Sequence, residues 1–407
     1  MARPQTFVIA GASLAGAKAA ETLRSEGFAG RVVLIGDEPV RPYERPPLSK
    51  AYLRGEVDFD SAAVHPEGFY TDHDVELLTS TTVTSIDTNA KQIEMDPGGL
   101  LAYDQLLLTT GAIPRQVTIP GGQLAGIHYL RSLSSCDSLR DALERATRLV
   151  VVGAGWIGSE VAASARQLGK EVALIEAGQV PLERVLGTEV GTMFRDLHAD
   201  RGVELHMGVG VQEFRGTAVA EQVVLADGSV VSGDLFVVGV GVSPRTELAQ
   251  AAGLALDNGV VVDQHLATSV PGIWAAGDVA DAYHPVFDAR IRLEHWSAAL
   301  NQGPVAAKNM LGQHVEYRKI PYFFSDQYDL GMEYNGFAAH WDQVVYRGDP
   351  ENREVIVFWL EAGVPVAGMN VNVSDVSEPI AALVAAKRQV DPAQLGNPDI
   401  DLASLLG

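Results

Sequence analysis

Two glycine turns are the residues whose types and spacing most clearly predict chemistry. In one of them, Gly153, Gly155 and Gly158 follow the apolar run 149–152 and precede an alanine-rich segment. Glycines with this G-x-G-x-x-G spacing let the backbone approach a pyrophosphate, and the N-terminus of the following helix offers it free N–H groups. The turn therefore predicts a dinucleotide-binding site.

An acidic residue after the next strand indicates which dinucleotide binds there. Glu176 ends the strand-like run 171–176. A carboxylate at this position can bind a ribose 2′-hydroxyl and repels a 2′-phosphate, so it favours NADH over NADPH. The alternative is a glycine turn that serves packing alone, and the joint presence of strand, turn, helix and acid argues against it.

A second glycine turn lies near the N-terminus and is imperfect. Gly11 and Gly16 keep the outer positions, but Ser13 replaces the middle glycine, and Asp37 takes the acidic position. A serine adds a side chain where the backbone meets phosphate. It weakens the motif without excluding nucleotide binding.

The two segments repeat one design, which predicts the fold class. Each has a buried apolar strand, a glycine turn, an alanine-rich helix and a second apolar strand that ends in an acid. Such βαβ units belong to parallel sheets covered on both faces. We expect an α/β protein with two Rossmann-like dinucleotide-binding domains. From about residue 317, aromatic alternating segments indicate a further antiparallel sheet, followed by helices at 379–388 and 392–406.

Composition excludes several classes of function. Lys and Arg total 30 against 52 Asp and Glu, and the resulting net charge of −22 disfavours nucleic-acid binding. Cys136 is the one cysteine, so an intrachain disulfide and a Cys-x-x-Cys redox pair are excluded, and we expect it to be a buried, inert residue. No uncharged apolar run approaches the roughly 20 residues that span a bilayer. We expect a cytoplasmic protein with no membrane insertion and no metal site.

Further motifs make a resemblance to one family specific. With the two glycine turns, the chain resembles the FAD-dependent NADH:ferredoxin reductases of oxygenase systems, which are flavoproteins of glutathione-reductase-like fold. The motifs that carry the resemblance are Arg45-Pro-Pro-Leu-Ser-Lys50, Leu130-Arg131, residues 153–160, residues 239–244, Trp274-Ala-Ala-Gly-Asp-Val279, Glu294-His-Trp296 and Phe324-Ser-Asp-Gln-Tyr328.

This resemblance implies cofactors and domain boundaries. FAD would bind an FAD-binding domain at residues 1–113 and 242–316, and NADH an NAD-binding domain at residues 114–241; a C-terminal α+β domain would cover residues 317–407. The implied FAD-binding residues are Gly11, Ala15, Gly16, Asp37, Arg45, Lys50, Val83, Arg131, Asp278 and Trp296. The implied NAD-binding residues are Gly153, Gly155, Gly158, Glu176 and Gly241.

The resemblance also assigns individual roles. Lys50 and Glu160 are implied to meet near flavin N5 as the catalytic pair, although an interdomain salt bridge without a redox role is the alternative. Asp37 and Asp278 would bind the adenosine ribose and the ribityl chain of FAD. Trp296 would lie either at the flavin edge or in the core beneath the cofactor.

The implied activity is electron transfer from NADH through FAD to an iron–sulfur ferredoxin, expected to be of the 2Fe–2S type. This transient partner would serve a cytochrome P450 or a ring-hydroxylating oxygenase, and the reductase itself would be a monomer or a weak homodimer. A rubredoxin reductase, an NADH oxidase, or a redox-controlled binding protein like apoptosis-inducing factor are alternatives. Candidate basic residues for docking an acidic ferredoxin are Arg54, Arg290, Arg292, Arg318 and Lys319.

Overall fold

The computed structural model describes residues 5–406, which form two compact units. Unit 1 contains residues 5–44, 59–113 and 243–323, and unit 2 contains residues 45–58, 114–242 and 324–406. Two of the crossings between the units lie within β8 (Ala112–Pro114) and β17 (Val242–Pro244). Within the described residues, no helix combines the length and the apolar character needed to cross a membrane.

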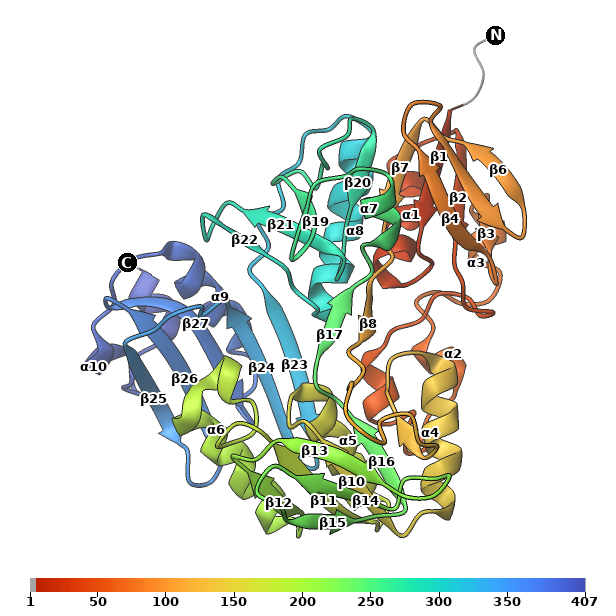
Figure 1. The fold of residues 1–407 in the computed structure, drawn as a ribbon. Coiled ribbons are helices and arrows are strands. Elements are labelled where there is room, and N and C mark those ends of the chain that lie inside the picture. Colours follow the sequence, from red (N-terminus) through yellow and green to blue (C-terminus); the bar gives the residue numbers. More distant parts are fainter. Residues whose placement is uncertain (1–4, 407) are drawn as a thin grey trace. The chain divides into compact units, whose positions relative to one another are not determined.

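Unit 1 is built on a five-stranded parallel sheet in the order β20-β7-β1-β2-β3. Its strands are almost wholly buried, because helices cover a parallel sheet. Helix α1 (Leu14–Ser25) packs closely on α8 (Trp296–Met310) (Figure 1). A Cβ at Gly303 of α8 would lie 2.2 Å from the Ala15 carbonyl oxygen, so glycine permits this close packing. The strands are β1 (Thr6–Ala10), β2 (Arg31–Ile35), β3 (Val75–Leu78), β7 (Gln105–Leu108) and β20 (Ile273–Ala275).

Two smaller sheets and three short helices complete unit 1. The antiparallel sheet consists of β4 (Thr82–Asp87), β5 (Gln92–Asp96) and β6 (Gly99–Ala102), and the mixed sheet of β18 (Leu256–Asp257), β19 (Gly259–Val262), β21 (Ala280–His284) and β22 (Ala289–Ile291). The helices are α2 (Phe59–Ala62), α3 (Phe69–Asp72) and α7 (Glu247–Ala251).

Unit 2 repeats the parallel design, as the internal echo in the sequence predicts. Its sheet has the order β12-β11-β10-β16-β9, and α5 connects β10 to β11. The strands are β9 (Ile127–His128), β10 (Arg148–Val152), β11 (Glu171–Glu176), β12 (Glu204–Met207) and β16 (Leu235–Val238). The accompanying elements are η1 (Pro46–Ser49), α4 (Leu133–Arg145), α5 (Trp156–Gln167), α6 (Glu183–Asp200) and an antiparallel sheet of β13 (Val211–Arg215), β14 (Gln222–Leu225) and β15 (Val230–Ser232).

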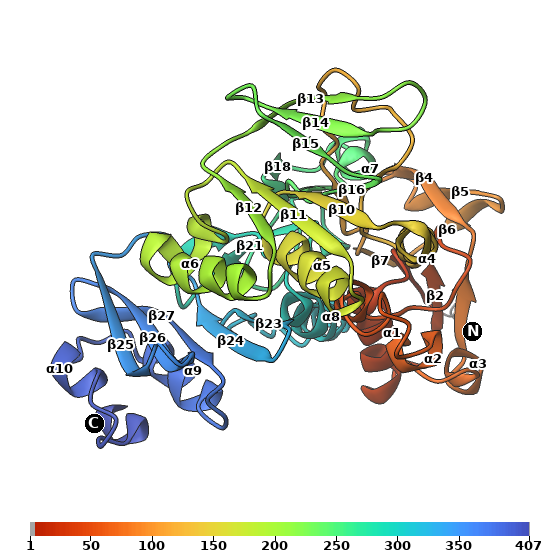
Figure 2. The ribbon, with the colours of Figure 1, turned by 90° about the horizontal axis from the view of Figure 1, so that it is seen from below.

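The C-terminal part is a five-stranded antiparallel sheet in the order β23-β24-β27-β26-β25, with α9 against β27 (Figure 2). The expected helix at 392–406 is wrong as one element: it divides into α10 (Pro392–Leu395) and η2 (Leu402–Leu406). Gly396-Asn397-Pro398 interrupts the helix, because proline has no N–H to donate and disfavours a helical residue before it, and Arg347 donates to the carbonyl oxygens of Asn397 and Ile400 at 2.5 and 2.6 Å. The other elements are β23 (Tyr322–Gln327), β24 (Leu330–Gly336), β25 (Gln343–Asp349), β26 (Glu354–Glu361), β27 (Val364–Val371) and α9 (Ser377–Ala386).

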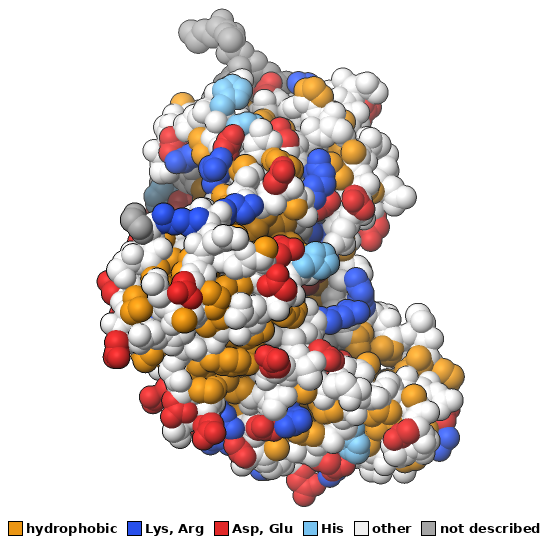
Figure 3. Space-filling view, turned by 90° about the vertical axis from the view of Figure 1, so that its left-hand side faces the viewer, with side chains coloured by type: hydrophobic (Ala, Val, Ile, Leu, Met, Phe, Trp, Pro, Cys, Tyr) orange, Lys and Arg blue, Asp and Glu red, His pale blue; other side chains and the backbone are white. Residues whose placement is uncertain are grey.

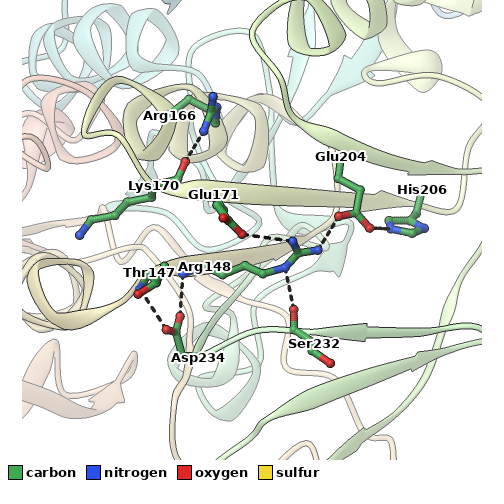
Figure 4. A network of polar contacts seen from close by, with 9 residues as sticks. All are labelled: Thr147, Arg148, Arg166, Lys170, Glu171, Glu204, His206, Ser232 and Asp234. Carbon is green, nitrogen blue, oxygen red and sulfur yellow. Dashed lines mark hydrogen bonds and ion pairs between the residues drawn. The ribbon is translucent and has the colours of Figure 1, made fainter.

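Arg148 links the strands of unit 2 at the amino ends of β10 and β11 (Figure 4). Its guanidinium forms an ion pair with Glu204 of β12, lies 3.5 Å from the Glu171 carboxylate, and donates to the Ser232 carbonyl oxygen of β15 at 2.8 Å. Asp234 accepts from the Arg148 backbone N–H at 2.8 Å. One side chain thus ties together β10, β11, β12 and β15.

We expect Arg148→Met to lower the free energy of unfolding by about 1–2 kcal/mol, because charge-assisted hydrogen bonds to three strands are lost. Urea unfolding followed by circular dichroism measures this change. Arg215→Met is the control, because its partner Glu213 lies on the same strand, and we expect less than about 0.5 kcal/mol there. Equal losses in the two variants would show that Arg148 does not link the sheet.

Candidate functional site

In the glycine turn of unit 2, two glycines are required by packing and the third leaves open space. Gly153 has φ +99°, and a Cβ there would lie 2.5 Å from the Gly239 carbonyl oxygen. A Cβ at Gly158 would lie 1.9 Å from the Gly153 carbonyl oxygen. Gly155, the N-cap of α5, has φ −73°, and a Cβ there would meet no described atom within 4 Å. The turn therefore leaves space for a ligand to come close to the protein backbone at Gly155.

The turn of unit 1 shows the same division and explains its serine. A Cβ at Gly11, where φ is +127°, would lie 2.1 Å from the Thr109 carbonyl oxygen, and one at Gly16 would lie 2.2 Å from the Gly11 carbonyl oxygen. Ser13 is the N-cap of α1 with extended backbone, φ −120°, which any residue adopts. The two closely packed positions therefore keep glycine, while the position equivalent to Gly155 accepts a side chain.

The two acidic residues that follow these units have different partners. Glu176 accepts the backbone N–H of Ala154 at 2.6 Å and that of Gly178 at 2.9 Å, so its carboxylate is fixed beside the glycine turn. Asp37 instead forms an ion pair with Arg245 at 2.9 Å, and both side chains are exposed. The Glu176 carboxylate is thus fixed by two backbone N–H groups, whereas the Asp37 carboxylate pairs with an arginine side chain at the surface.

Asp278 lies at the same sheet edge as the turn of unit 1. It follows β20, whose carboxyl end lies beside those of β7 and β1 in the parallel sheet. Its side chain is 9% exposed, and the N–H of Gly277 donates to the Gln302 side chain at 2.8 Å. A Cβ at Gly277 would lie 3.3 Å from that of Ala15 in the first turn of α1. The carboxyl edge of such a sheet is where nucleotides bind, so Ala15 and Asp278 fit the FAD positions predicted for them.

The other predicted cofactor residues are spread over both units. Trp296 begins α8 and faces Glu44; burial raises the pKa of the Glu44 carboxyl, and the Trp296 contact lowers it in part. Val83 lies on β4 at a β-bulge. In unit 2, the Arg45 guanidinium donates to the Arg131 carbonyl oxygen. Gly241, with φ +104°, follows β16. Their cofactor roles stay predictions.

Lys50 and Glu160 meet within unit 2, as the sequence resemblance implies. The Lys50 Nζ lies 2.8 Å from Glu160 Oε2, and the Glu160 residue is 5% exposed. Two hydroxyls also donate to this carboxylate: Ser49 Oγ to Oε2 at 2.5 Å and Ser325 Oγ to Oε1 at 2.6 Å. Nζ also lies 5.5 Å from the centre of the Phe324 ring. Both oxygens of the buried carboxylate are therefore engaged, by one cation and two hydroxyls in all.

Ser49 and Ser325 are the site residues that sequence reasoning missed. Both lie inside motifs that carry the family resemblance, one directly before Lys50 and the other directly after Phe324. The positions of these residues in the sequence do not predict that Ser325 of β23 lies beside Glu160 of α5. The aromatic run 322–324 is typical of a domain core, which fits Phe323, 6% exposed, while the Phe324 ring contacts Lys50.

Cys136 is buried, as expected. It is 0% exposed, its Sγ lies 3.1 Å from the Leu48 carbonyl oxygen, and burial raises the pKa of the thiol to about 12. A thiol with so high a pKa is a poor nucleophile.

The expected basic docking residues are largely paired with acids. Arg292 was a wrong candidate, because its side chain is 6% exposed and forms an ion pair with Glu294 at 2.6 Å. Arg54 pairs with Glu56 at 2.7 Å and Arg318 with Glu316 at 2.8 Å. Figure 3 shows Lys and Arg side chains interspersed with Asp and Glu on the face that it draws.

Known proteins match both the N-terminal and the C-terminal part of the chain. Residues 5–303 match the family described as pyridine nucleotide-disulphide oxidoreductase, and residues 322–406 match the family described as reductase C-terminal. Rhodocoxin reductase of Rhodococcus erythropolis is 37% identical over 400 residues, which cover 98% of this chain and 93% of that protein. The ferredoxin–NAD(+) reductase component of the anthranilate 1,2-dioxygenase system of Burkholderia cepacia is 38% identical over 403 residues, 98% of this chain and 99% of that protein.

A solved structure extends the likeness to three dimensions. The reductase in the crystal structure of the covalent putidaredoxin reductase–putidaredoxin complex superposes with a TM-score of 0.95 at 33% identity, covering 100% of this chain and 99% of that one. The predicted α/β fold with two dinucleotide-binding domains and a C-terminal domain is confirmed. The chain therefore belongs to the pyridine nucleotide-disulphide oxidoreductase family, as an FAD-dependent flavoprotein of its NADH:ferredoxin reductase branch.

Proposed function

We propose that this protein passes electrons from NADH through FAD to a 2Fe–2S ferredoxin that serves a cytochrome P450 or a ring-hydroxylating oxygenase. The observation that carries the proposal is the match to reductases of such systems over 98% of the chain, a span that includes both glycine turns. Bound FAD supplies the conversion, because a flavin accepts the two electrons of a hydride and releases them one at a time.

The glycine turns bind and orient the two nucleotides. The N-termini of α1 and α5 present backbone N–H groups, and the open space at Gly155 admits a pyrophosphate close to the backbone. Glu176 receives a ribose 2′-hydroxyl while its two backbone N–H partners hold it in place. Asp278, at the carboxyl edge of the unit 1 sheet, would accept a hydrogen bond from a hydroxyl of the FAD ribityl chain.

Lys50 and Glu160 form the pair that sets the charge at flavin N5. The Lys50 ammonium would supply positive charge to a bound flavin, and the Glu160 carboxylate fixes the direction of that ammonium. Such a buried pair is costly by itself, but the Ser49 and Ser325 hydroxyls also donate to the carboxylate, one to each oxygen. The support for this role is the geometry of the pair together with the family resemblance.

Cysteine content separates this chain from the disulphide reductases that give the family its name. Cys136 is the one cysteine, and its thiol is buried with a pKa raised to about 12. A protein disulfide therefore cannot act as the next electron carrier. Electrons must leave to an acceptor outside the chain, which fits a transient ferredoxin partner. The proposed protein is cytoplasmic and acts as a monomer or a weak homodimer.

Rates with competing acceptors test the proposal. With NADH in excess, a 2Fe–2S ferredoxin is expected to be reduced far faster than rubredoxin or dissolved oxygen. Equal or faster turnover with oxygen would make the protein an NADH oxidase, and a preference for rubredoxin would identify a rubredoxin reductase.

Nucleotide preference gives a separate prediction. NADH is expected to exceed NADPH by at least about tenfold in kcat/KM, because the fixed Glu176 carboxylate repels a 2′-phosphate. Glu176→Arg should narrow the preference, while Glu221→Arg, at an exposed position directly before β14, should not alter it. Steady-state kinetics with both nucleotides measure the ratio. Equal kcat/KM values for NADH and NADPH in the unaltered protein would show that Glu176 does not contact the ribose of the nucleotide.

A further inference from the structure

A buried chain of hydrogen bonds runs from Glu160 into the C-terminal sheet and on to α6. Ser325 Oγ lies 2.6 Å from Glu160 Oε1, and Gln327 Nε2 lies 3.3 Å from Ser325 Oγ. His198 Nε2 lies 3.0 Å from Gln327 Oε1, and the Tyr328 hydroxyl lies 3.1 Å from His198 Nδ1. These residues come from α5, β23, α6 and the turn after β23, all within unit 2.

The chemistry of each group fixes the direction of the chain. The Ser325 hydroxyl donates to the carboxylate, so its oxygen accepts from the Gln327 amide nitrogen. The amide oxygen then accepts from His198, which must carry its proton on Nε2. This leaves Nδ1 as an acceptor for the Tyr328 hydroxyl. Every donor in the chain therefore points toward Glu160.

The groups between the two ends of the chain are buried and neutral. Ser325, Gln327 and His198 are each 0% exposed. Burial lowers the pKa of His198 to about 4, so the ring carries one proton at neutral pH, as the chain requires. Burial likewise raises the pKa of the Tyr328 hydroxyl. In such surroundings a hydrogen bond is stronger than in water, and successive bonds polarise one another.

The charged groups lie at the two ends of the chain. Lys50 contacts Glu160 at one end. At the other, the Arg201 guanidinium lies 5.3 Å from the centre of the Tyr328 ring, and both Arg166 and Arg201 act electrostatically on the Tyr328 hydroxyl. The negative charge of Glu160 thus faces one cation directly and the aligned donors of the chain on its other oxygen.

We propose that Ser325, supported by Gln327 and His198, is a positioning residue that holds the Glu160 carboxylate oriented toward Lys50. Oε1 is engaged by Ser325, which leaves Oε2 for Lys50 and Ser49. The C-terminal sheet thereby contributes directly to the electrostatics of the Lys50–Glu160 pair. The positioning of Glu160 is inferred from the hydrogen bonds alone, whereas its role in flavin reduction rests on the proposed function.

Infrared spectroscopy of the flavoprotein labelled with carboxyl-¹³C glutamate tests the proposal without NADH or ferredoxin. The carboxylate stretching band of Glu160 is the one that Glu160→Gln removes, and its frequency reports the hydrogen bonds that the two oxygens accept. Ser325→Ala is expected to shift this band, because Oε1 loses its donor while Oε2 keeps Lys50 and Ser49. Gln327→Met should shift the band less, and Ser325→Thr, which keeps the hydroxyl, should leave it at the frequency of the unaltered protein.

Ser159→Ala is the matched control, because this buried serine is adjacent to Glu160 on α5 but its hydroxyl points to the Ala154 carbonyl oxygen. Its Glu160 band should have the frequency of the unaltered protein. An unchanged band in Ser325→Ala would overturn the proposal. Should that variant not fold, Ser325→Cys must shift the band, and no shift would overturn the proposal equally. A failure to reduce ferredoxin would refute the proposed function and leave this band unaffected.

Discussion

Glu160→Ala is expected to slow NADH-driven flavin reduction by about 100-fold or more, as removal of a positioned charge from an active site commonly does. The substitution leaves the Lys50 ammonium, whose side chain is 12% exposed, without its carboxylate, and Ser49 and Ser325 without their acceptor. Anaerobic stopped-flow spectroscopy of the flavin absorbance measures the rate.

Lys50→Ala should slow the same step, because it leaves a buried carboxylate without its cation. The double variant should lose less than the sum of the two single losses, since each single change removes the same interaction, and the coupling should be about 0.5–3 kcal/mol. Arg31→Ala is the control: its ion pair with Glu76 has a similar 2.8 Å separation but is exposed. Rates in both single variants equal to that of the unaltered protein would make the pair a structural bridge.

The second large effect is expected from two glycines of one turn that should respond in opposite ways. Gly158→Ala should lower the free energy of unfolding by about 1–3 kcal/mol, because its Cβ would lie 1.9 Å from the Gly153 carbonyl oxygen and force α5 away from β10. Gly155→Ala should change stability by less than about 0.5 kcal/mol, since its Cβ meets open space among the described atoms.

Gly155→Ala, which should hardly change stability, should have a large effect on NADH binding. Its alanine variant should raise the KM for NADH by about tenfold or more, because the added methyl occupies the space where the backbone receives the pyrophosphate. Thermal unfolding and NADH titration, performed on the same two variants, separate these outcomes. An unchanged KM in Gly155→Ala would show that the open space at this N-cap is not where the nucleotide lies.

The architecture of the two parallel sheets could be predicted because its causes are local. Apolar runs such as 7–10 and 149–152 specify buried parallel strands, and the glycines that follow them specify the turns. The prediction of one helix at 392–406 overlooked a local signal: Gly396-Asn397-Pro398 interrupts a helix, because proline lacks an N–H and disfavours a helical residue before it. Arg347, on β25, donates to the carbonyl oxygens of Asn397 and Ile400 in the segment between the two short helices.

The site was predictable only where a resemblance supplied the pairing. Lys50 and Glu160 are far apart in the sequence, and neither periodicity nor charge pattern joins them. Ser325, Gln327 and His198 meet because β23 and α6 pack within unit 2, so sequence reasoning could not place them. Arg292 illustrates the opposite error, because a charge expected at the surface is buried against Glu294.

The most direct test of electron transfer from NADH to ferredoxin is an anaerobic titration. Catalytic amounts of the protein are mixed with excess 2Fe–2S ferredoxin, and NADH is added in measured portions while ferredoxin reduction is followed by absorbance. Because NADH carries two electrons and each ferredoxin accepts one, two ferredoxins should be reduced for each NADH, over many turnovers. Consumption of one NADH per flavin, followed by a long-lived reduced flavoprotein and unreduced ferredoxin, would contradict the account and identify a redox-controlled binding protein instead.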